Sequence, residues 1–381
     1  MISSAWAQEG DSVYEGWEPP FEVPAREAIL VDASTDTVLY AKNPDEQMPP
    51  ASMSKLMTVY MVFDALKAGE LKLTDTFPVS EKAWRKGGSK MFVKVRDRVA
   101  IEDLLRGVIV QSGNDASIVL AEGLGGSEEF FADMMNEKAQ DIGLKNSNFE
   151  NATGWPDSDH RMTARDLATL AEAIITTFPE YYGYYSEREF TYGVSLDGKP
   201  ITQPNRNPVL GIVEGADGLK TGHTEAAGYG LTASAKRDDR RLVLVFNGMN
   251  SARERSRFAE RFLEWGFRNF DAFKLLEAGQ VVDEPRVWLG KAARVPLVVE
   301  EDLRLTLPRR TRDDMEARLV YEAPIPAPIK KGTPLGRLVL SAPDMEDKII
   351  PLVAGADVEK VQMFGKIGSA LEYLFLGASG Q

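Results

Sequence analysis

The sequence predicts an α+β fold, with a mostly antiparallel sheet flanked by helices in a first domain and a small all-β domain after it. Strand patterns occur near both ends of the segment 22–274, and helical patterns occupy its middle. Beyond it, in 275–356, short β-rich runs alternate with proline, glycine and charged residues. Helices that lie between the strands of one sheet usually cover it, so these observations define both domains.

Composition limits what kind of protein this is. The chain has 381 residues, of which 43% are hydrophobic and 27% are charged, as in a globular protein with room for more than one core. Lys and Arg number 45 against 58 Asp and Glu, and the resulting net charge of −13 argues against binding to nucleic acid. Because the chain has no cysteine, thiol nucleophiles, disulfides and cysteine metal sites are excluded.

The two ends of the chain are expected to concern location rather than catalysis. Residues 1–21 contain "AWA" before Gln8, the small-x-small pattern of a signal-peptidase site, so we interpret them as the remnant of an export signal; a disordered start is the alternative. Residues 357–381 form an amphipathic tail, which could lie flat on a membrane or pack on its own domain. No apolar run reaches the ~18 residues of a membrane-spanning helix.

The first domain is expected to begin with a hairpin and to continue as helices. Two β-rich runs surround a Ser-Thr-Asp turn in 28–43. From Ser52 onward apolar residues recur at helical spacing and spread nearly all round, which indicates a buried helix. Helices are also expected at 101–122, 128–142 and 163–177, and a capping-box pattern opens the last of them.

Strands return in the last part of the first domain. The segment 229–248 predicts two apolar strands joined by a charged turn. The preceding "GADGLKTGH" is expected on a neighbouring strand or at its end. A helix at 251–270, with aromatic residues near one stripe, then closes the domain.

The stretch "PPASMSKLMT" (49–58) places a serine and a lysine where they could do chemistry. Ser52 and Lys55 are three residues apart at a helix start, so both project from one face. A serine attacks only when a base takes its proton, and a lysine becomes that base when burial or nearby positive charge lowers its pKa. The helix N-terminus also favours the negative charge that develops on the serine. By itself, however, Ser-x-x-Lys more often marks a capped helix with a solvated lysine.

A second motif, "VIVQSGNDAS", places Ser112 and Asn114 after an apolar run. Gly113 between them allows the backbone to turn tightly. The hydroxyl could relay a proton, and the amide could hold a substrate carbonyl or the lysine. Alone, this pattern more often marks a turn between two helices.

A third motif, "DGLKTGHTEAAGYG", contains Lys220, Thr221 and Gly222. A lysine and a hydroxyl on a strand edge can bind a substrate carboxylate, and the glycine allows an extended peptide backbone to approach closely. A solvated lysine on an edge strand is the alternative.

The three motifs, in this order and with these separations, resemble those of the low-molecular-mass penicillin-binding proteins that act as D-alanyl-D-alanine carboxypeptidases. The stretches "ASMSKLMT", "SGNDAS", "DGLKTGHTEAAGYGL" and "EWGFR" are each similar to that family, and the resemblance extends from about residue 25 to about 355. The middle motif is Ser-Gly-Asn rather than the Ser-Asp-Asn of class A lactamases, which fits the carboxypeptidases. The resemblance implies a β-lactamase/transpeptidase-like fold that uses neither a metal nor an organic cofactor.

The resemblance also implies roles for the matching catalytic residues. Ser52 would be acylated, and Lys55 would be its base. Ser112 and Asn114 would shuttle protons and orient the substrate.

Further matching residues are implied to bind the substrate around Gly222. Lys220 and Thr221 would contact the terminal carboxylate. The backbone N–H of His223, with that of the acylated serine, would form the oxyanion hole. Arg253, in "NSARERS", matches an arginine that helps to hold the carboxylate, with Arg255 as a close neighbour.

The implied function is removal of the terminal D-alanine from peptidoglycan stem pentapeptides through an acyl-enzyme. It would take place in the bacterial periplasm, or peripherally on the outer face of the inner membrane, and β-lactams would inhibit it by acylating the same serine. A D,D-endopeptidase, a β-lactamase and a non-catalytic peptidoglycan-binding scaffold are the alternatives. The loop 150–166 shows no obvious glutamate that could serve as the hydrolytic base of a lactamase.

Other hydrolytic chemistries find little support in the sequence. The only histidines are His160 and His223, and neither a Gly-x-Ser-x-Gly elbow nor a His-Glu-x-x-His zinc motif occurs. His160, in "NATGWPDSDHRMT", is expected at the surface, and Trp155 in the same loop could form a wall of the substrate groove.

Overall fold

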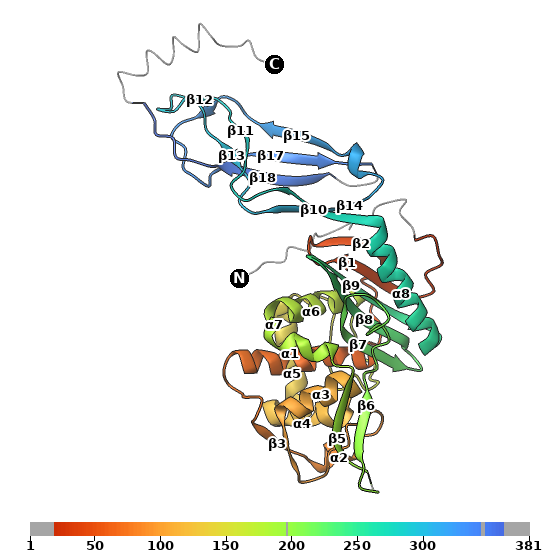
Figure 1. Cartoon of the computed structure of the whole chain (residues 1–381). Helices are drawn as coiled ribbons and strands as arrows, with labels where there is room; N and C mark the ends of the chain where they lie inside the picture. The colour runs from red at the N-terminus through yellow and green to blue at the C-terminus, as the bar shows by residue number, and fades with distance from the viewer. Residues whose placement is uncertain (1–18, 196, 344–346, 362–381) are drawn as a thin grey trace. The chain divides into compact units, whose positions relative to one another are not determined.

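The computed structural model describes residues 19–195, 197–343 and 347–361. These residues form two compact units that adjoin along the chain at Arg268 and Asn269 (Figure 1). We expected this boundary after residue 274, but β10 (Phe270–Leu276) pairs with β14 (Leu303–Pro308) and is part of the second unit. Most of the predicted export-signal remnant and most of the predicted amphipathic tail lie outside the described residues.

One antiparallel sheet organises the first unit. Its strand order is β2–β1–β9–β8–β7, so the first strands of the unit pair with the last. Leu30 in β1 lies opposite Leu244 in β9, and both ends of the segment therefore build the sheet, as predicted. β7 forms one edge. The strands are β1 (Glu27–Asp32), β2 (Thr37–Lys42), β7 (Ala216–Thr224), β8 (Gly228–Arg237) and β9 (Arg240–Met249).

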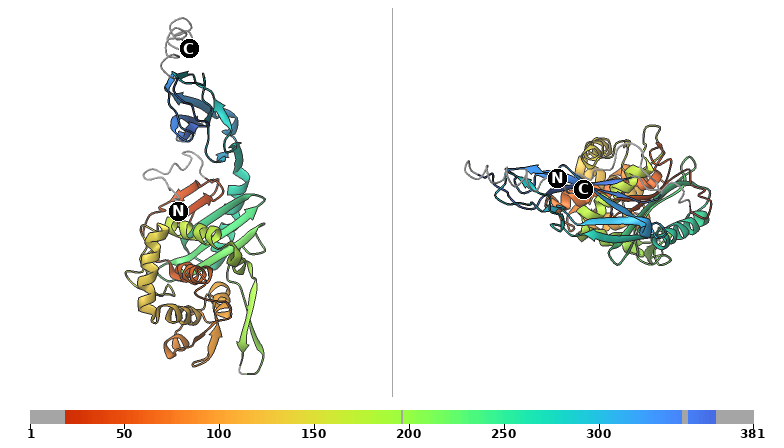
Figure 2. Two further views of the ribbon diagram at one scale, coloured as in Figure 1. Left: turned by 90° about the vertical axis from the view of Figure 1, so that its left-hand side faces the viewer. Right: turned by 90° about the horizontal axis from the view of Figure 1, so that it is seen from above.

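Helices cover both faces of this sheet (Figures 1 and 2). On one face lies α8 (Ala252–Asn269), where the rings of Phe262 and Tyr40 are 5.0 Å apart. On the other face α6 (Ala164–Thr177) contacts β1 and β9. Alternate strand residues therefore enter different layers, and the predicted α+β architecture is confirmed.

The helices of the middle segment lie where the sequence predicted them, with one exception. α1 (Lys55–Lys67) is buried on nearly all sides, and α5 (Glu128–Ile142) has its predicted bounds. The prediction of one helix over 101–122 is wrong, because Ser112 has a φ of 60° and ends α3 (Ile101–Gln111) before α4 (Asn114–Gly125) begins. The shorter elements here are β3 (Thr76–Pro78), α2 (Glu81–Arg85), β4 (Arg98–Ala100), α7 (Pro179–Tyr182), β5 (Glu189–Val194) and β6 (Pro200–Pro204).

The described residues of the second unit form strands and one 3₁₀ turn at Arg312–Asp314, as the prediction of a β-rich domain requires. Its main sheet has the order β11–β13–β18–β17–β15, and buried leucines such as Leu340 and Leu352 form its core. In the described part of the chain, no helix is both long and apolar enough to cross a membrane. The remaining strands are β11 (Val281–Asp283), β12 (Val287–Trp288), β13 (Leu297–Val298), β15 (Glu316–Tyr321), β16 (Ile325–Pro326), β17 (Pro334–Ser341) and β18 (Lys348–Ala354).

Candidate active site

The serine of the first motif lies in a tight turn that leads into a buried helix. Ala51–Ser54 form a 3₁₀ turn directly before α1, so Ser52 belongs to this turn and not to the first α-helical turn. Ala51 has a left-handed φ of 49°. A β-carbon on Gly154 would overlap the Ala51 carbonyl, so only glycine fits there. The loop that contains Gly154 therefore helps to set the position of the serine.

Lys55 is fully buried, and its amine is directed at the serine. Its Nζ donates to Ser52 Oγ at 2.9 Å, to Asn114 Oδ1 at 2.8 Å and to the carbonyl of Thr153. Three acceptors from three segments fix the position of the nitrogen. At this distance a neutral amine can take the proton of the serine hydroxyl.

The surroundings of Lys55 favour this neutral form. Burial lowers the pKa of its amine from the usual 10.5 to about 7, and the positive charges of Arg206 and Lys86 act in the same direction. The carboxylates of Asp115 and Glu128 only partly oppose them. Near neutral pH a large fraction of the protein therefore carries a lone pair beside Ser52, as activation of a serine by a lysine requires.

The second and third motifs meet at the cleft that Ser52 lines. Lys220 Nζ donates to Ser112 Oγ at 2.8 Å and to the carbonyl of Thr221 at 3.1 Å. Burial holds the pKa of Lys220 well below its usual value, and the charges of Lys55 and Arg206 add to this. The left-handed backbone of Ser112 separates its side chain from α3 and places its hydroxyl between the motifs.

Gly222 allows the edge strand to approach the nucleophile. A β-carbon on Gly222 would lie 2.8 Å from the Pro50 carbonyl and 3.1 Å from Met53 Cγ, which lie on either side of Ser52 in the sequence. This glycine therefore serves the approach of β7 to the 3₁₀ turn, and any larger residue would force the two apart. Its expected role in the approach of a substrate backbone stays a prediction, and Gly222 lines the same cleft as Ser52.

A cleft of about 460 Å³ opens beside these side chains, and two unpaired arginines give it a positive charge. Neither Arg206 nor Arg255 has an ion-pair partner among the described residues. Arg253, which the resemblance implied, is exposed and lines a different depression beside Arg257. Residues two apart on a helix do not share a face, so α8 can place only Arg255 in the cleft. The cleft is lined by Ser52, Ser89, Ser112, Arg206, Thr221, Gly222, His223, Tyr229 and Arg255.

His223 lies at the open side of this cleft. Its ring is exposed and stacks on Tyr229, with the centroids 3.8 Å apart. The guanidinium of Arg255 lies 5.7 Å from the same tyrosine ring. The aromatic pair therefore fixes the orientation of the cleft wall, which no sequence motif had indicated.

The start of α4 holds the loop between α2 and β4, which borders the cleft at Ser89. Sequence reasoning missed this connection. Asn114 Nδ2 donates to the carbonyl of Gly87 at 2.9 Å, while its Oδ1 accepts from Lys55 Nζ. The Asp115 carboxylate accepts the backbone N–H groups of Met91 and Phe92 at 3.0 and 2.9 Å. An Asn-Asp pair at a helix start is a common cap, so the sequence alone gave no signal for this second use.

The loop 151–161, which includes Trp155, lines a neighbouring pocket and not the cleft itself. Trp155 is half-exposed, and the Lys86 ammonium lies 4.4 Å from its ring centroid. The prediction of a surface position for His160 is wrong, since only 2% of this residue is exposed. Its ring packs edge-on against Phe149, which the polar composition of the loop did not indicate. In the described ranges no three His, Asp or Glu side chains lie together as a metal site.

Two protein families match this chain over most of its length. Residues 15–251 match the family described as D-alanyl-D-alanine carboxypeptidase, Peptidase S11. Residues 270–360 match the C-terminal domain of penicillin-binding protein 5.

Individual proteins named D-alanyl-D-alanine carboxypeptidase are similar to this chain over nearly its whole length. D-alanyl-D-alanine carboxypeptidase DacA of Haemophilus influenzae is 37% identical over 96% of this chain and 92% of its own length. DacC of Escherichia coli is 39% identical over 91% of this chain and 87% of its own length. The crystal structure of penicillin-binding protein 5 from H. influenzae superimposes with a TM-score of 0.81 at 38% identity and covers 90% of this chain and 100% of its own.

Replacement of Gly222 tests the packing argument. Gly222→Ala should lower the free energy of unfolding by about 1–3 kcal/mol, because the added methyl group would crowd the Pro50 carbonyl. Gly183→Ala is the matched control, because no atom lies within 4 Å of its β-carbon and its φ of −55° suits alanine. It should change stability by less than about 1 kcal/mol. Chemical denaturation measures both, and equal losses for the two variants would contradict the account.

Proposed function

The chain belongs to the D-alanyl-D-alanine carboxypeptidase family Peptidase S11 and is a serine-type D-Ala-D-Ala carboxypeptidase, and on this premise we propose how its residues act. The substrate we propose is a peptidoglycan stem pentapeptide. The observation that carries the mechanism is the fully buried amine of Lys55, 2.9 Å from Ser52 Oγ.

Acylation begins at Ser52. Its Oγ attacks the carbonyl carbon between the two D-alanines while Lys55 Nζ takes the hydroxyl proton. The C–N bond then breaks, and the nitrogen of the terminal D-alanine must gain a proton to leave. The proton that Lys55 took from Ser52 balances this one, and Ser112 can deliver a proton to the nitrogen, because its hydroxyl borders the same cleft and lies 2.8 Å from Lys220. Water afterwards cleaves the ester, returns a proton to Ser52 Oγ and releases the shortened peptide.

Asn114 acts in this mechanism by positioning other groups. Its oxygen accepts from Lys55 and its nitrogen donates to Gly87, so both ends of the amide are engaged within the protein. Asn114 is therefore better placed to orient the amine of Lys55 than to orient the substrate. The amide also ties the amine to the loop that borders the cleft.

The terminal carboxylate of the substrate is proposed to bind beside Thr221. Arg206 and Arg255 carry positive charge that no described carboxylate neutralises, and Lys220 lies behind them. An anion in the cleft would therefore gain charge-assisted hydrogen bonds. The backbone N–H groups of Ser52 and His223 are proposed to bind the oxyanion, as the resemblance implied.

The cleft favours a carboxypeptidase over a β-lactamase. No Asp or Glu is among the described residues that line it, so a carboxylate base for rapid ester hydrolysis is missing there. In the loop 150–166, Asp166 accepts from Asn146 and Ser147 instead. We therefore propose that β-lactams acylate Ser52 and that the resulting ester is hydrolysed slowly. A structure similar to this chain at 28% identity and a TM-score of 0.59 is that of penicillin-binding protein D2 of Listeria monocytogenes in its ampicillin-bound form, which supports this proposal.

The proposed location is the bacterial periplasm, which is where a peptidoglycan substrate would be met. Contact of the tail 357–381 with the outer face of the inner membrane remains our proposal from its amphipathic sequence.

Replacement of the nucleophile tests the acyl-enzyme. Ser52→Ala should abolish covalent labelling by a fluorescent penicillin and lower D-alanine release from a D-Ala-D-Ala peptide by at least roughly 10³-fold, because in the described part of the chain no other hydroxyl is hydrogen-bonded to Lys55 Nζ. Gel fluorescence and a D-alanine assay measure the two effects. Labelling of Ser52→Ala at the wild-type rate would refute the assignment.

A pair of arginine variants tests carboxylate recognition. Arg255→Gln should raise KM for the D-Ala-D-Ala peptide at least about tenfold, since a hydrogen bond to a charged group would be lost. Arg253→Gln, on the same helix but outside the cleft, should leave KM within about twofold. Steady-state kinetics distinguish them, and the reverse order of effects would restore Arg253 to the role that the sequence suggested.

A further inference from the structure

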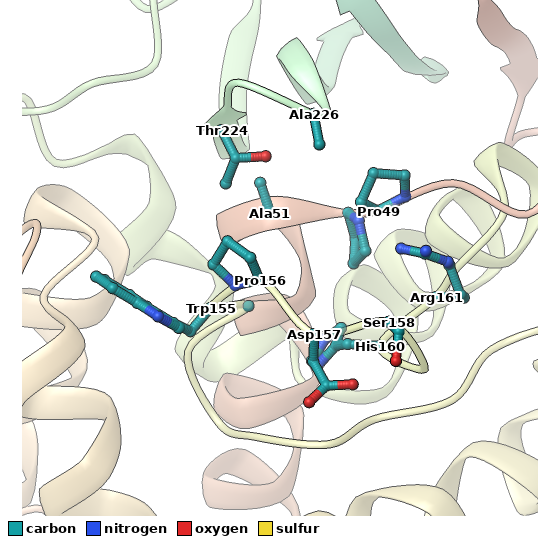
Figure 3. Close-up of a pocket in the computed structure, with 12 residues that line it drawn as sticks. Pro49, Ala51, Trp155, Pro156, Asp157, Ser158, His160, Arg161, Thr224 and Ala226 are labelled. Carbon is teal, nitrogen blue, oxygen red and sulfur yellow. The ribbon is translucent and has the colours of Figure 1, made fainter.

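A second pocket of about 280 Å³ lies beside the cleft and has no role in the mechanism above. Figure 3 shows it between the turn before Ser52, the loop 154–161 and the end of β7. Pro49, Pro50 and Pro156 provide apolar walls, and Arg161 and His160 provide polar groups.

The pocket continues the cleft along the edge strand. Thr221 to His223 line the cleft, and the next residue of β7, Thr224, lines the pocket. Ala51, which precedes the nucleophile, lines the pocket as well. If the terminal carboxylate group binds at Thr221, the last residue of a peptide paired with β7 lies opposite Gly222 and the one before it opposite His223. The third residue from the end then lies opposite Thr224, roughly 10 Å from Thr221. The pocket is therefore placed to receive the third residue from the end of the substrate.

Arg161 brings a positive charge to this pocket. Its backbone is held by reciprocal hydrogen bonds with Asn148, at 3.0 and 2.8 Å, so the base of the side chain is fixed. Within the described residues its guanidinium has no hydrogen bond or ion pair. In Figure 3 this side chain extends toward Pro49, whereas the Asp157 carboxylate extends away from it. Asp157 also lines the pocket and its charge acts on His160, but an anion beside the guanidinium would lie away from the Asp157 carboxylate.

His160, a buried residue that also lines the pocket, carries a second unsatisfied donor. Its Nδ1 accepts the backbone N–H of Glu150 at 3.2 Å, so the neutral ring carries its proton on Nε2. Burial lowers the pKa of this imidazole to about 4, which keeps the ring neutral in ordinary conditions. Nε2 has no hydrogen-bond partner among the described residues. A buried donor without a partner is unusual in a folded protein and indicates a missing acceptor.

We propose that this pocket binds a carboxylate carried by the substrate on the acyl side of the scissile bond, with Arg161 as the residue that determines this specificity. The proposal rests on the function proposed above, because that function sets the direction of the peptide along β7. It adds a preference that the catalytic residues do not provide: a peptide with an acidic side chain at the third position from its end is hydrolysed more efficiently than its neutral counterpart.

The test compares two peptides that differ only in charge, N-acetyl-Glu-D-Ala-D-Ala and N-acetyl-Gln-D-Ala-D-Ala. For the full-length wild type, kcat/KM should be at least about tenfold higher for the glutamate peptide. Arg161→Gln should remove most of this preference through KM while the glutamine peptide is hydrolysed as before. Arg161→Lys should restore part of it, because the charge returns without the planar guanidinium. Arg257→Gln, an exposed arginine of α8, is the matched control.

The outcomes separate the two proposals. An unchanged glutamate preference in Arg161→Gln, or none in the wild type, overturns the pocket assignment while D-alanine release upholds the proposed function. Equal losses for both peptides in Arg161→Gln also overturn it, and the rate of labelling by a fluorescent penicillin then shows whether the fold is damaged. If the wild type released no D-alanine from either peptide yet was labelled, the proposed function itself would fail.

Discussion

The site depends on one physical constraint: the amine of Lys55 must be buried beside Ser52 in its neutral form. The chain meets this constraint with burial and with charge. α1 is buried nearly all round, which removes the lysine from solvent, and acceptors from the loop 151–161 and from α4 fix its nitrogen. Because Arg206 and Lys86 add positive charge nearby, the protonated amine is disfavoured further.

The same excess of positive charge also prepares the cleft for its substrate. An otherwise acidic chain, with a net charge of −13, concentrates Lys55, Lys220, Arg206 and Arg255 around one cleft. Burial keeps the lysines from being strongly charged, while the arginines retain their charge and have no described ion-pair partner. In the proposed mechanism, one electrostatic arrangement thus supplies both a base and an anion-binding site. The pocket at Arg161 would extend this pattern to the acyl side of the substrate.

Much of the site could be predicted from sequence because its key contacts are local or belong to motifs. The spacing of Ser52 and Lys55 places them together on any helical turn, and the strands at both ends of the first unit fix the sheet. The choice between Arg253 and Arg255 depended on the rotation of α8 about its axis, which aromatic periodicity defines only roughly. The break at Ser112, the carbonyl of Thr153 and the burial of His160 arise from tertiary contacts that leave no pattern in a single sequence. Arg206 follows a strand in a polar loop and carries no motif at all.

The pH dependence of the acylation rate tests the central claim most directly. The rate constant for penicillin labelling, followed from about pH 5 to pH 9, should rise with pH and level off above a midpoint near 7, because only the neutral amine of Lys55 can take the proton. Lys86→Gln should move the midpoint upward, since it removes a charge that lowers this pKa. A rate that does not change over this range, or that falls as pH rises, would contradict the account of a neutral lysine as the base.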